Sequence, residues 1–261
     1  MIIVTGTKRS GTSMWMHVLI AAGLPFIGDR FPAGWGELLR HANPDGFFES
    51  ELMAGINYRS NPHPRTGAYL APQQTRDHAV KVFIQGLVRT DVAFIDRCVA
   101  TVRGWRAYVA SVRRVGLESP NMPPALEWWV DNYALIRDLA IRGYPAHVVS
   151  YSGFLRDPER VATEVLAWIG TGDATRAAAV VRPQRQRAVE DPGADAELAD
   201  GIAPRHLEVF DELYECIDRE RPLTAGFVDK LNSTNAALRP MILEHQARLQ
   251  ASTVTDILGR Q

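Results

Sequence analysis

The stretch Met1-Ile2-Ile3-Val4-Thr5-Gly6-Thr7-Lys8-Arg9-Ser10-Gly11-Thr12-Ser13 decides the fold. Residues 1–5 form a short β-branched run that suits a buried parallel strand. A glycine-bearing loop follows at residues 6–11, and residues 12–22 have the pattern of a helix. Two glycines five positions apart, between a strand and a helix, are typical of a phosphate-binding loop. In such a loop the backbone N–H groups converge on an anion at the helix N-terminus.

Strand and helix patterns alternate over the next 150 residues or so. Strands are predicted at 79–84, 98–102 and 147–150, and helices at 49–59, 105–114, 123–142 and 158–169. This alternation predicts an α/β fold, with a parallel β-sheet flanked by helices on both faces. Two more predicted helices, at 204–218 and 224–257, make the C-terminal region from about residue 204 to residue 261 helical. We expect residues 1–261 to form one domain.

The composition predicts a globular protein that has to build any anion site locally. Hydrophobic residues make up 46% of the chain and charged residues 23%, and the formal net charge is −1. The net charge therefore gives no general attraction to nucleic acid or to a membrane surface. No run of about 18 apolar residues predicts a spanning helix. Cys98 and Cys216 have no spacing typical of a metal site or a disulfide framework. We expect a cytoplasmic protein with free thiols.

The cations of the glycine loop stand in an unusual place for a nucleotide triphosphatase. Such an enzyme carries Lys directly after the second glycine, where this chain has Thr12. Here the cations come earlier, at Lys8 and Arg9. No acidic residue at the end of an apolar strand offers itself as a magnesium ligand. A P-loop kinase or hydrolase remains an alternative, although the pattern counts against it.

The segment from Lys8 to Ser13 resembles the 5′-phosphosulfate loop of the sulfotransferases that depend on PAPS, 3′-phosphoadenosine 5′-phosphosulfate. The loop of that family has Pro, then Lys or Arg, then Ser-Gly-Thr-Thr/Ser. Lys8 stands where Pro is usual, and Arg9 falls on the catalytic cation of the family. The resemblance implies a P-loop sulfotransferase fold, PAPS as the donor and no metal. It also implies a donor site that includes Lys8, Arg9, Ser10, Gly11, Thr12 and Ser13.

An arginine and a serine farther along the chain extend the resemblance. Arg103 follows an apolar strand, and Ser111 comes eight residues later. In the family, an Arg and a Ser at this spacing hold the 3′-phosphate of PAPS, and the fork of a guanidinium suits a phosphate. Gly104-Trp105 replaces the usual Asp-Pro here. In the alternative interpretation, Arg103 is a surface arginine and Ser111 is a serine of the helix, and neither binds a phosphate.

Two other segments resemble the family, and one basic cluster is a further candidate. Residues 148–158 are similar to a strand that ends in Tyr-Glu-Asp-Leu and is followed by Asp-Pro. This match places Tyr151 near the adenine, although Ser152-Gly153 replaces Glu-Asp. Residues 43–49, Asn-Pro-Asp-Gly-Phe-Phe-Glu, resemble a segment of bacterial sulfotransferase-like proteins. The basic cluster either closes over the 3′-phosphate or is a solvated loop; it comprises Arg182, Arg185 and Arg187.

The resemblance implies catalysis by positioning and charge stabilisation, as in phosphoryl transfer. Arg9 is expected to meet the charge that grows on the leaving phosphate. An alcohol acceptor also needs a base. Cytosolic members of the family use a His two positions after a strand Lys, but two positions after Lys81 this chain has Phe83. Other branches use a Glu after the first helix, for which Glu49 is the first candidate and Glu37 the second.

Both charged residues beside this proposed centre also have plain structural alternatives. Glu49 would complement a helix dipole if a helix began there, and Lys81 would be a strand lysine that reaches solvent. In the catalytic interpretation, Lys81 contacts the sulfuryl oxygens or the acceptor.

We therefore expect an enzyme that moves a sulfuryl group from PAPS to a hydroxyl or amine acceptor and releases PAP, adenosine 3′,5′-bisphosphate. Aromatic side chains in and beside the loops 24–48 and 60–78 favour a small-molecule or glycan-like acceptor. They are Trp35, Phe47, Phe48, Tyr58 and Tyr69. A catalytically silent module that binds a nucleotide or a partner protein is a further alternative, because the chain departs from the family at Lys8, 104–105 and 152–153.

Overall fold

The structure is a computed structural model that describes residues 1–32, 43–120, 122–182, 198–199 and 201–258. The chain divides into two units. The first unit comprises Met1–Arg103 and Ala134–Arg187, and the second comprises Gly104–Tyr133 and Ala188–Gln261. The expectation of a single domain stays a prediction.

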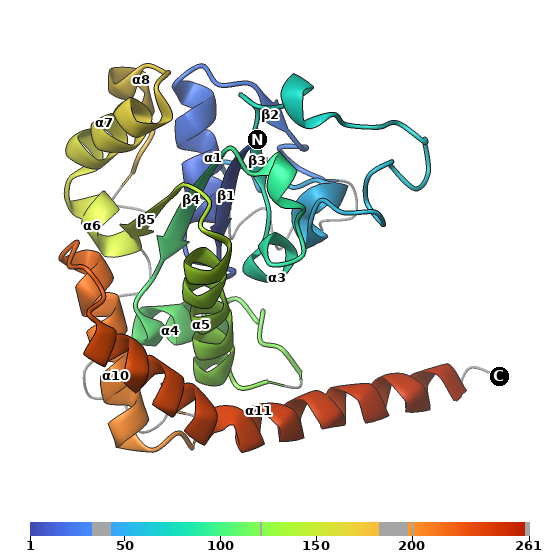
Figure 1. The fold of residues 1–261 in the computed structure, drawn as a ribbon, viewed down its shortest axis with the longest axis vertical. Coiled ribbons are helices and arrows are strands. Elements are labelled where there is room, and N and C mark those ends of the chain that lie inside the picture. The colour runs from blue at the N-terminus through green and yellow to red at the C-terminus, as the bar shows by residue number, and fades with distance from the viewer. Residues whose placement is uncertain (33–42, 121, 183–197, 200, 259–261) are drawn as a thin grey trace. The chain divides into compact units, whose positions relative to one another are not determined.

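A five-stranded parallel sheet lies in the first unit (Figure 1). Its strands are β1 (Ile2–Gly6), β2 (Phe26–Ile27), β3 (Ala79–Lys81), β4 (Arg97–Val102) and β5 (Ala146–Ser150). The strand order is β2-β3-β1-β4-β5, and Ile3 of β1 pairs with Val80 on one side and Cys98 on the other. All five residues of β1 are buried, as expected for a strand at the centre of a sheet covered on both faces. The prediction of an α/β fold with a parallel sheet is confirmed.

One face of this sheet packs against helices α1 (Thr12–Ala21), α6 (Tyr151–Arg156), α7 (Pro158–Ile169) and α8 (Ala174–Ala179). Trp15 of α1 stacks on Phe154 of α6, with ring centroids 4.3 Å apart. Alternate strand residues, among them Val4 and Val99, point into this core because side chains alternate between the two faces of a strand. Lys81 pairs in register with Val4 and therefore points to the same face as α1.

Helix α5 (Pro124–Arg142) begins in the second unit and ends in the first. In the first unit its last turn joins α3 (Ile84–Leu87), because Arg142 donates hydrogen bonds to the carbonyl oxygens of Thr90 and Leu87 at 2.6 and 2.8 Å. Asp138 accepts hydrogen bonds from Arg142 and from the Tyr144 hydroxyl. These contacts pin the end of α5 near β4. The described residues of the unit also contain three 3₁₀-helices: η1 (Glu51–Ala54), η2 (Pro72–Gln74) and η3 (Val92–Phe94).

The second unit is helical in the part of it that the structure describes. It contains α4 (Trp105–Arg114), the first turns of α5, α10 (Pro204–Asp218) and α11 (Ala225–Leu258). Trp129 stacks on Phe210 at 4.7 Å between ring centroids, and the buried Trp105 donates its indole N–H to Asp211 at 2.8 Å. The predicted C-terminal helices are confirmed. Of the aromatic side chains of α5, Trp128 and Trp129 are core residues, whereas Tyr133 is half-buried.

Two local predictions are wrong: a helix ends early at a glycine, and a strand ends early because the chain leaves the sheet to begin α3 at Ile84. The predicted helix at 49–59 is only η1, which ends at Gly55 with φ +111°. The strand predicted at 79–84 ends at Lys81. The strand predicted at 147–150 is confirmed by β5. Tyr151 then begins α6, because the hydroxyl of Ser150 accepts a hydrogen bond from the Gly153 N–H at 2.9 Å and caps that helix.

Candidate functional site

Four strands of the first unit end at one edge of the sheet. The order β3-β1-β4-β5 brings together Lys81 at the end of β3, the glycine loop after β1, Arg103 after β4, and Tyr151 after β5. The chain moves from β1 to β3 on one side and later to β4 on the other, so the strand order reverses at β1. Ligands of open α/β sheets bind outside the carboxyl ends of the strands at such a point.

The glycine loop is held by hydrogen bonds of its own and by one from β4. The Ser10 hydroxyl donates to the carbonyl oxygen of Thr7 at 2.7 Å, and the Thr101 hydroxyl donates to the carbonyl oxygen of Ser10 at 2.9 Å. Arg9 adopts φ +64°, a left-handed conformation that non-glycine residues seldom take. The loop therefore has one defined shape, with a strained residue at its centre.

Both glycines of the loop are required by what surrounds them. A Cβ atom at Gly6 would collide with the carbonyl oxygen of Thr101 and the hydroxyl of Ser10. Gly11 has φ +102°, and a Cβ atom there would lie 2.8 Å from Cδ2 of Tyr151. Gly11 occupies the N-cap of α1, where no side chain caps the helix, and the first turn of α1 contains no acidic residue. The dipole of α1 is thus left to favour an anion at this end.

Lys81 joins the glycine loop to the segment that contains Glu49. Its ammonium nitrogen Nζ lies 2.6 Å from Oε1 of Glu49, 3.2 Å from the carbonyl oxygen of Phe47 and 3.3 Å from the hydroxyl of Ser13. Both charged side chains are buried, each 4% exposed. Burial lowers the pKa of Lys81, and the carboxylate of Glu49 opposes that shift.

Only one oxygen of the Glu49 carboxylate takes part in this network. The other, Oε2, is buried and accepts no hydrogen bond from the described part of the chain. A buried polar atom in this state costs free energy unless a ligand or water satisfies it. The alternative of a helix-start carboxylate does not hold, because Ser50, not Glu49, caps η1. The catalytic role of Glu49 stays a prediction.

The backbone around Phe48 brings Glu49 to Lys81. Phe48 has φ +54°, which is an outlier for a bulky residue. The turn at Phe48 lets the carbonyl oxygen of Phe47 and the carboxylate of Glu49 converge on one ammonium group. Backbone hydrogen bonds between Asp29 and Glu49, of 2.8 and 3.2 Å, hold the segment from its other side.

Arg103 and Tyr151 contact each other and the glycine loop. Arg103 follows the last residue of β4, as predicted, and its side chain is buried. Its Nη1 donates a hydrogen bond to the carbonyl oxygen of Arg9 at 3.1 Å, and its guanidinium carbon lies 4.6 Å from the ring centroid of Tyr151. The ring of Tyr151 also packs against the backbone of Gly11.

The other predicted donor-site residues are distributed as follows. Ser10 and Thr12 are buried, whereas Lys8, Arg9 and Ser13 are half-buried. Ser111 is fully buried in α4 of the second unit, so its pairing with Arg103 of the first unit stays a prediction. Arg182 is exposed. The remaining candidates lie outside the described residues: Glu37, Arg185 and Arg187.

Two residues of the site were not predicted from the sequence. Thr101 supports the loop through its hydroxyl, and Phe47 supplies a carbonyl oxygen to Lys81. The place of Thr101, one residue before the end of an apolar strand, is a weak indication in the sequence that it supports the loop. Nothing in the sequence marks a backbone carbonyl such as that of Phe47.

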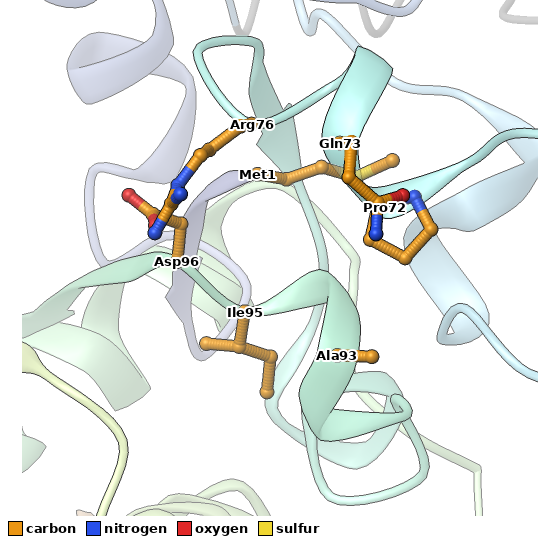
Figure 2. A pocket seen from close by; sticks show the side chains of 7 residues that line it. All are labelled: Met1, Pro72, Gln73, Arg76, Ala93, Ile95 and Asp96. Atoms are coloured by element: carbon orange, nitrogen blue, oxygen red, sulfur yellow. The ribbon is translucent and has the colours of Figure 1, made fainter.

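A pocket of about 260 Å³ lies elsewhere in the first unit (Figure 2). Its lining includes Met1, which precedes β1, and Asp96, which precedes β4. These residues stand at the amino ends of the strands, so the pocket belongs to the opposite edge of the sheet from the glycine loop. No helix in the described part of the chain is long and apolar enough to cross a membrane.

Comparison with known proteins leaves the family of this chain open. No family model matches it, and no curated protein matches it. Among solved structures, a sulfotransferase domain from the olefin synthase of Synechococcus PCC 7002 is similar, with a TM-score of 0.40 and 14% sequence identity. That similarity covers 90% of this chain and 94% of the other.

Proposed function

We propose that this protein is a PAPS-dependent sulfotransferase that transfers a sulfuryl group to a hydroxyl or amine of a small-molecule or glycan-like acceptor in the cytoplasm. One observation carries the proposal: the ammonium of Lys81 hydrogen-bonds both to Ser13, at the end of the phosphate loop, and to the buried carboxylate of Glu49. Glu49, the candidate base, is therefore connected through Lys81 to the loop that we propose binds the 5′-phosphate.

The residues around the loop suit the 5′-phosphate end of PAPS. The shape of the loop, with the N-terminus of α1 behind it, supplies N–H groups to an anion, and Gly6 and Gly11 keep Cβ atoms out of this region. The hydroxyl of Thr12 is a further donor, and Arg9 adds a positive charge. The hydroxyl of Ser13, which donates to the carbonyl oxygen of Phe47 at 3.3 Å, would turn to the phosphate when PAPS binds. PAPS, when bound, supplies the sulfuryl group.

The residues would divide the work of the transfer as follows. An acceptor oxygen attacks the sulfur atom, and the bond between sulfur and the bridging oxygen of the 5′-phosphate breaks. Arg9 stabilises the negative charge that develops on that leaving phosphate. Oε2 of Glu49 takes the proton of the acceptor hydroxyl, while Lys81 holds Oε1 and stabilises charge on the oxygens of the transferred group. PAP and the sulfated acceptor leave.

Nucleotide binding tests the donor half of the proposal. Calorimetric titration of the full chain with PAP, AMP and ATP is expected to give a dissociation constant for PAP of about 1–10 μM, at least about tenfold below those of the other two. A preference for ATP with magnesium would replace the proposal with a P-loop kinase or hydrolase. No binding of any nucleotide by the folded protein would refute a nucleotide-dependent activity.

Substitution of Glu49 tests the catalytic half. In assays that follow the release of PAP from PAPS with a panel of alcohols, phenols and sugars, Glu49→Gln should lower kcat by about 10²–10⁴-fold, the usual effect of a lost general base. Its affinity for PAP should stay within about twofold of wild type. Glu51→Gln is the matched control, because Glu51 lies two residues away and is exposed. If the two substitutions changed kcat equally, or if neither changed it, Glu49 would not be the base of the reaction.

A further inference from the structure

The contacts of Arg103 run to the backbone of the phosphate loop. We propose that Arg103 and Tyr151 brace the left-handed turn at Arg9, and that both are positioning residues for the 5′-phosphate site. The resemblance assigns Arg103 to the 3′-phosphate and Tyr151 to the adenine, so this role is additional for the first residue and different for the second. The inference rests on the proposed function for its ligands but not for its geometry.

The first element of the brace is the hydrogen bond from Arg103 to the loop. Nη1 of Arg103 donates to the carbonyl oxygen of Arg9 at 3.1 Å, and the arginine side chain is buried. A charged donor strengthens such a bond, and burial shields it from competition by water. The peptide group that follows Arg9 is therefore held in one orientation, in which the N–H group of Ser10 donates to the carbonyl oxygen of Thr7 at 3.2 Å and closes the turn of the loop.

The second element is the strain that the bond offsets. Arg9 has φ +64°, a strained conformation for a non-glycine residue, which persists only where the surrounding structure imposes it. Two bonds do so from β4 and the residue after it: Arg103 holds the carbonyl oxygen of Arg9, and Thr101 holds that of Ser10. Consecutive carbonyl groups of the loop are thus fixed from the neighbouring strand.

The third element is the ring of Tyr151, which contacts Arg103 and Gly11 at once. The guanidinium carbon lies 4.6 Å from the ring centroid, within the range of a cation–π interaction. A Cβ atom on Gly11 would lie 2.8 Å from Cδ2 and 3.1 Å from Cε2 of the same ring, so the ring packs directly on the loop backbone. Tyr151 therefore holds the guanidinium at a fixed place relative to the loop.

The position of Tyr151 is itself fixed by the core. Tyr151 is the first residue of α6, and the Ser150 hydroxyl caps that helix. Three residues later, Phe154 is fully buried and stacks on Trp15 of α1 at 4.3 Å. Helix α1 begins at the phosphate loop, so the start of α1, the loop, Arg103 and Tyr151 form a closed chain of contacts.

Three ligands separate the brace from the roles that the resemblance implies. PAP carries both phosphates, AMP lacks the 3′-phosphate, and inorganic pyrophosphate lacks the adenosine as well. If Tyr151 acts through the loop, Tyr151→Leu weakens all three ligands by the same factor, on the order of tenfold. Tyr151→Phe keeps the ring and stays within about twofold of wild type. Arg103→Ala weakens AMP and pyrophosphate as well as PAP. Ile141→Ala, at an exposed position of the same unit, is the control.

Hydrogen exchange of the ligand-free protein provides a second measurement that needs no ligand. The brace predicts faster exchange of the amides of residues 9–13 in Tyr151→Leu than in wild type or Tyr151→Phe, with unchanged exchange in the core of α7. Urea unfolding of each variant verifies that it is folded.

The outcomes distinguish the brace at Arg9 from the proposal that PAPS is the donor. Equal losses for the three ligands, with faster exchange in the loop, support the brace. A Tyr151→Leu loss confined to PAP and AMP shows an adenine contact instead, and an Arg103→Ala loss confined to PAP shows a 3′-phosphate contact alone; either result overturns the brace. If wild type binds AMP as tightly as PAP, the PAPS donor is wrong while the brace is still tested. If it binds none of the ligands, the exchange result alone decides.

Discussion

Lys81 and Glu49 form a buried ion pair: 2.6 Å separate Nζ of the lysine from Oε1 of the glutamate, and each side chain is 4% exposed. The two residues lie 32 positions apart in the chain. Placing two charges in the interior is costly, and their attraction offsets this cost only when both are present. Such a pair contributes little to stability compared with a pair of apolar residues, and it lies beside the glycine loop.

The first prediction concerns the stability of this pair. Lys81→Met should lower the free energy of unfolding by about 3–5 kcal/mol, because it leaves a buried carboxylate without its cation. The double variant Lys81→Met/Glu49→Leu should recover most of that loss. Urea unfolding measures both. Lys230→Met provides the comparison, since Lys230 pairs with Glu212 on the surface and its loss should cost less than about 1 kcal/mol. Additive effects of the two buried substitutions would contradict the coupling.

The second prediction concerns Thr101, which supports the loop from β4. Thr101→Val keeps the shape of the side chain but leaves the buried carbonyl oxygen of Ser10 without the hydroxyl donor that now contacts it at 2.9 Å. We expect a loss of about 1–3 kcal/mol in urea unfolding. Nucleotide affinity should also fall, because the loop loses one of its restraints. Thr101→Ser retains the hydroxyl and should stay closer to wild type; a loss as large as that of the valine variant would show that packing, and not the hydrogen bond, matters.

The third prediction separates steric conflict from backbone strain at Gly11. Gly11→Ala places a Cβ atom 2.8 Å from Tyr151 in a backbone with φ +102°. Gly170→Ala is the matched variant, because Gly170 has φ +89° and nothing lies within 4 Å of its Cβ position. The second variant should lose only the cost of a left-handed alanine, roughly 1–2 kcal/mol, and keep its anion binding. The first should lose more stability and most of its affinity for PAP. Equal behaviour of the two would mean that the Tyr151 ring moves away without consequence.

The fourth prediction concerns the thiols. Burial raises the pKa of Cys98 to about 12, whereas Cys216 is half-buried. Because the thiolate is the reactive form, iodoacetamide near pH 8 should label Cys216 of the native protein and reach Cys98 only after unfolding. Mass spectrometry of peptides identifies the labelled residue. Labelling of Cys98 at a comparable rate in the native protein would refute its burial.

The same pKa shift predicts a dependence of stability on pH. The usual pKa of a Cys is 9.0, so between pH 9 and about 12 the unfolded chain has released the Cys98 proton while the folded chain still holds it. The stability that Cys98 contributes is complete below pH 9 and is lost as the pH rises through this window. The free energy of unfolding, measured with urea, should therefore fall less between pH 9 and about 12 in Cys98→Ala than in wild type. A steeper decline in the variant would reverse the sign of the shift.

Several elements follow from short-range patterns in the sequence. Helix α7 has the predicted bounds, Pro158–Ile169, because Pro is tolerated in a first turn and Gly170 takes the left-handed conformation that ends a helix. Strand β1 could be predicted because a β-branched run directly before a glycine loop is typical of a buried strand. Strand β2, with two residues, carries no periodicity, so only its pairing with β3 defines it.

Local patterns of the sequence predict the parallel α/β architecture, the glycine loop at the start of α1, and the place of Arg103 after β4, because these depend on periodicity and on the two glycines. Which groups meet around that loop depends on the tertiary structure. The pairing of Glu49 with Lys81, the hydrogen bond from Arg103 to Arg9, and the packing of Tyr151 on Gly11 join residues far apart in the chain. These contacts arise from the strand order and from the turn at Phe48, which no local pattern specifies.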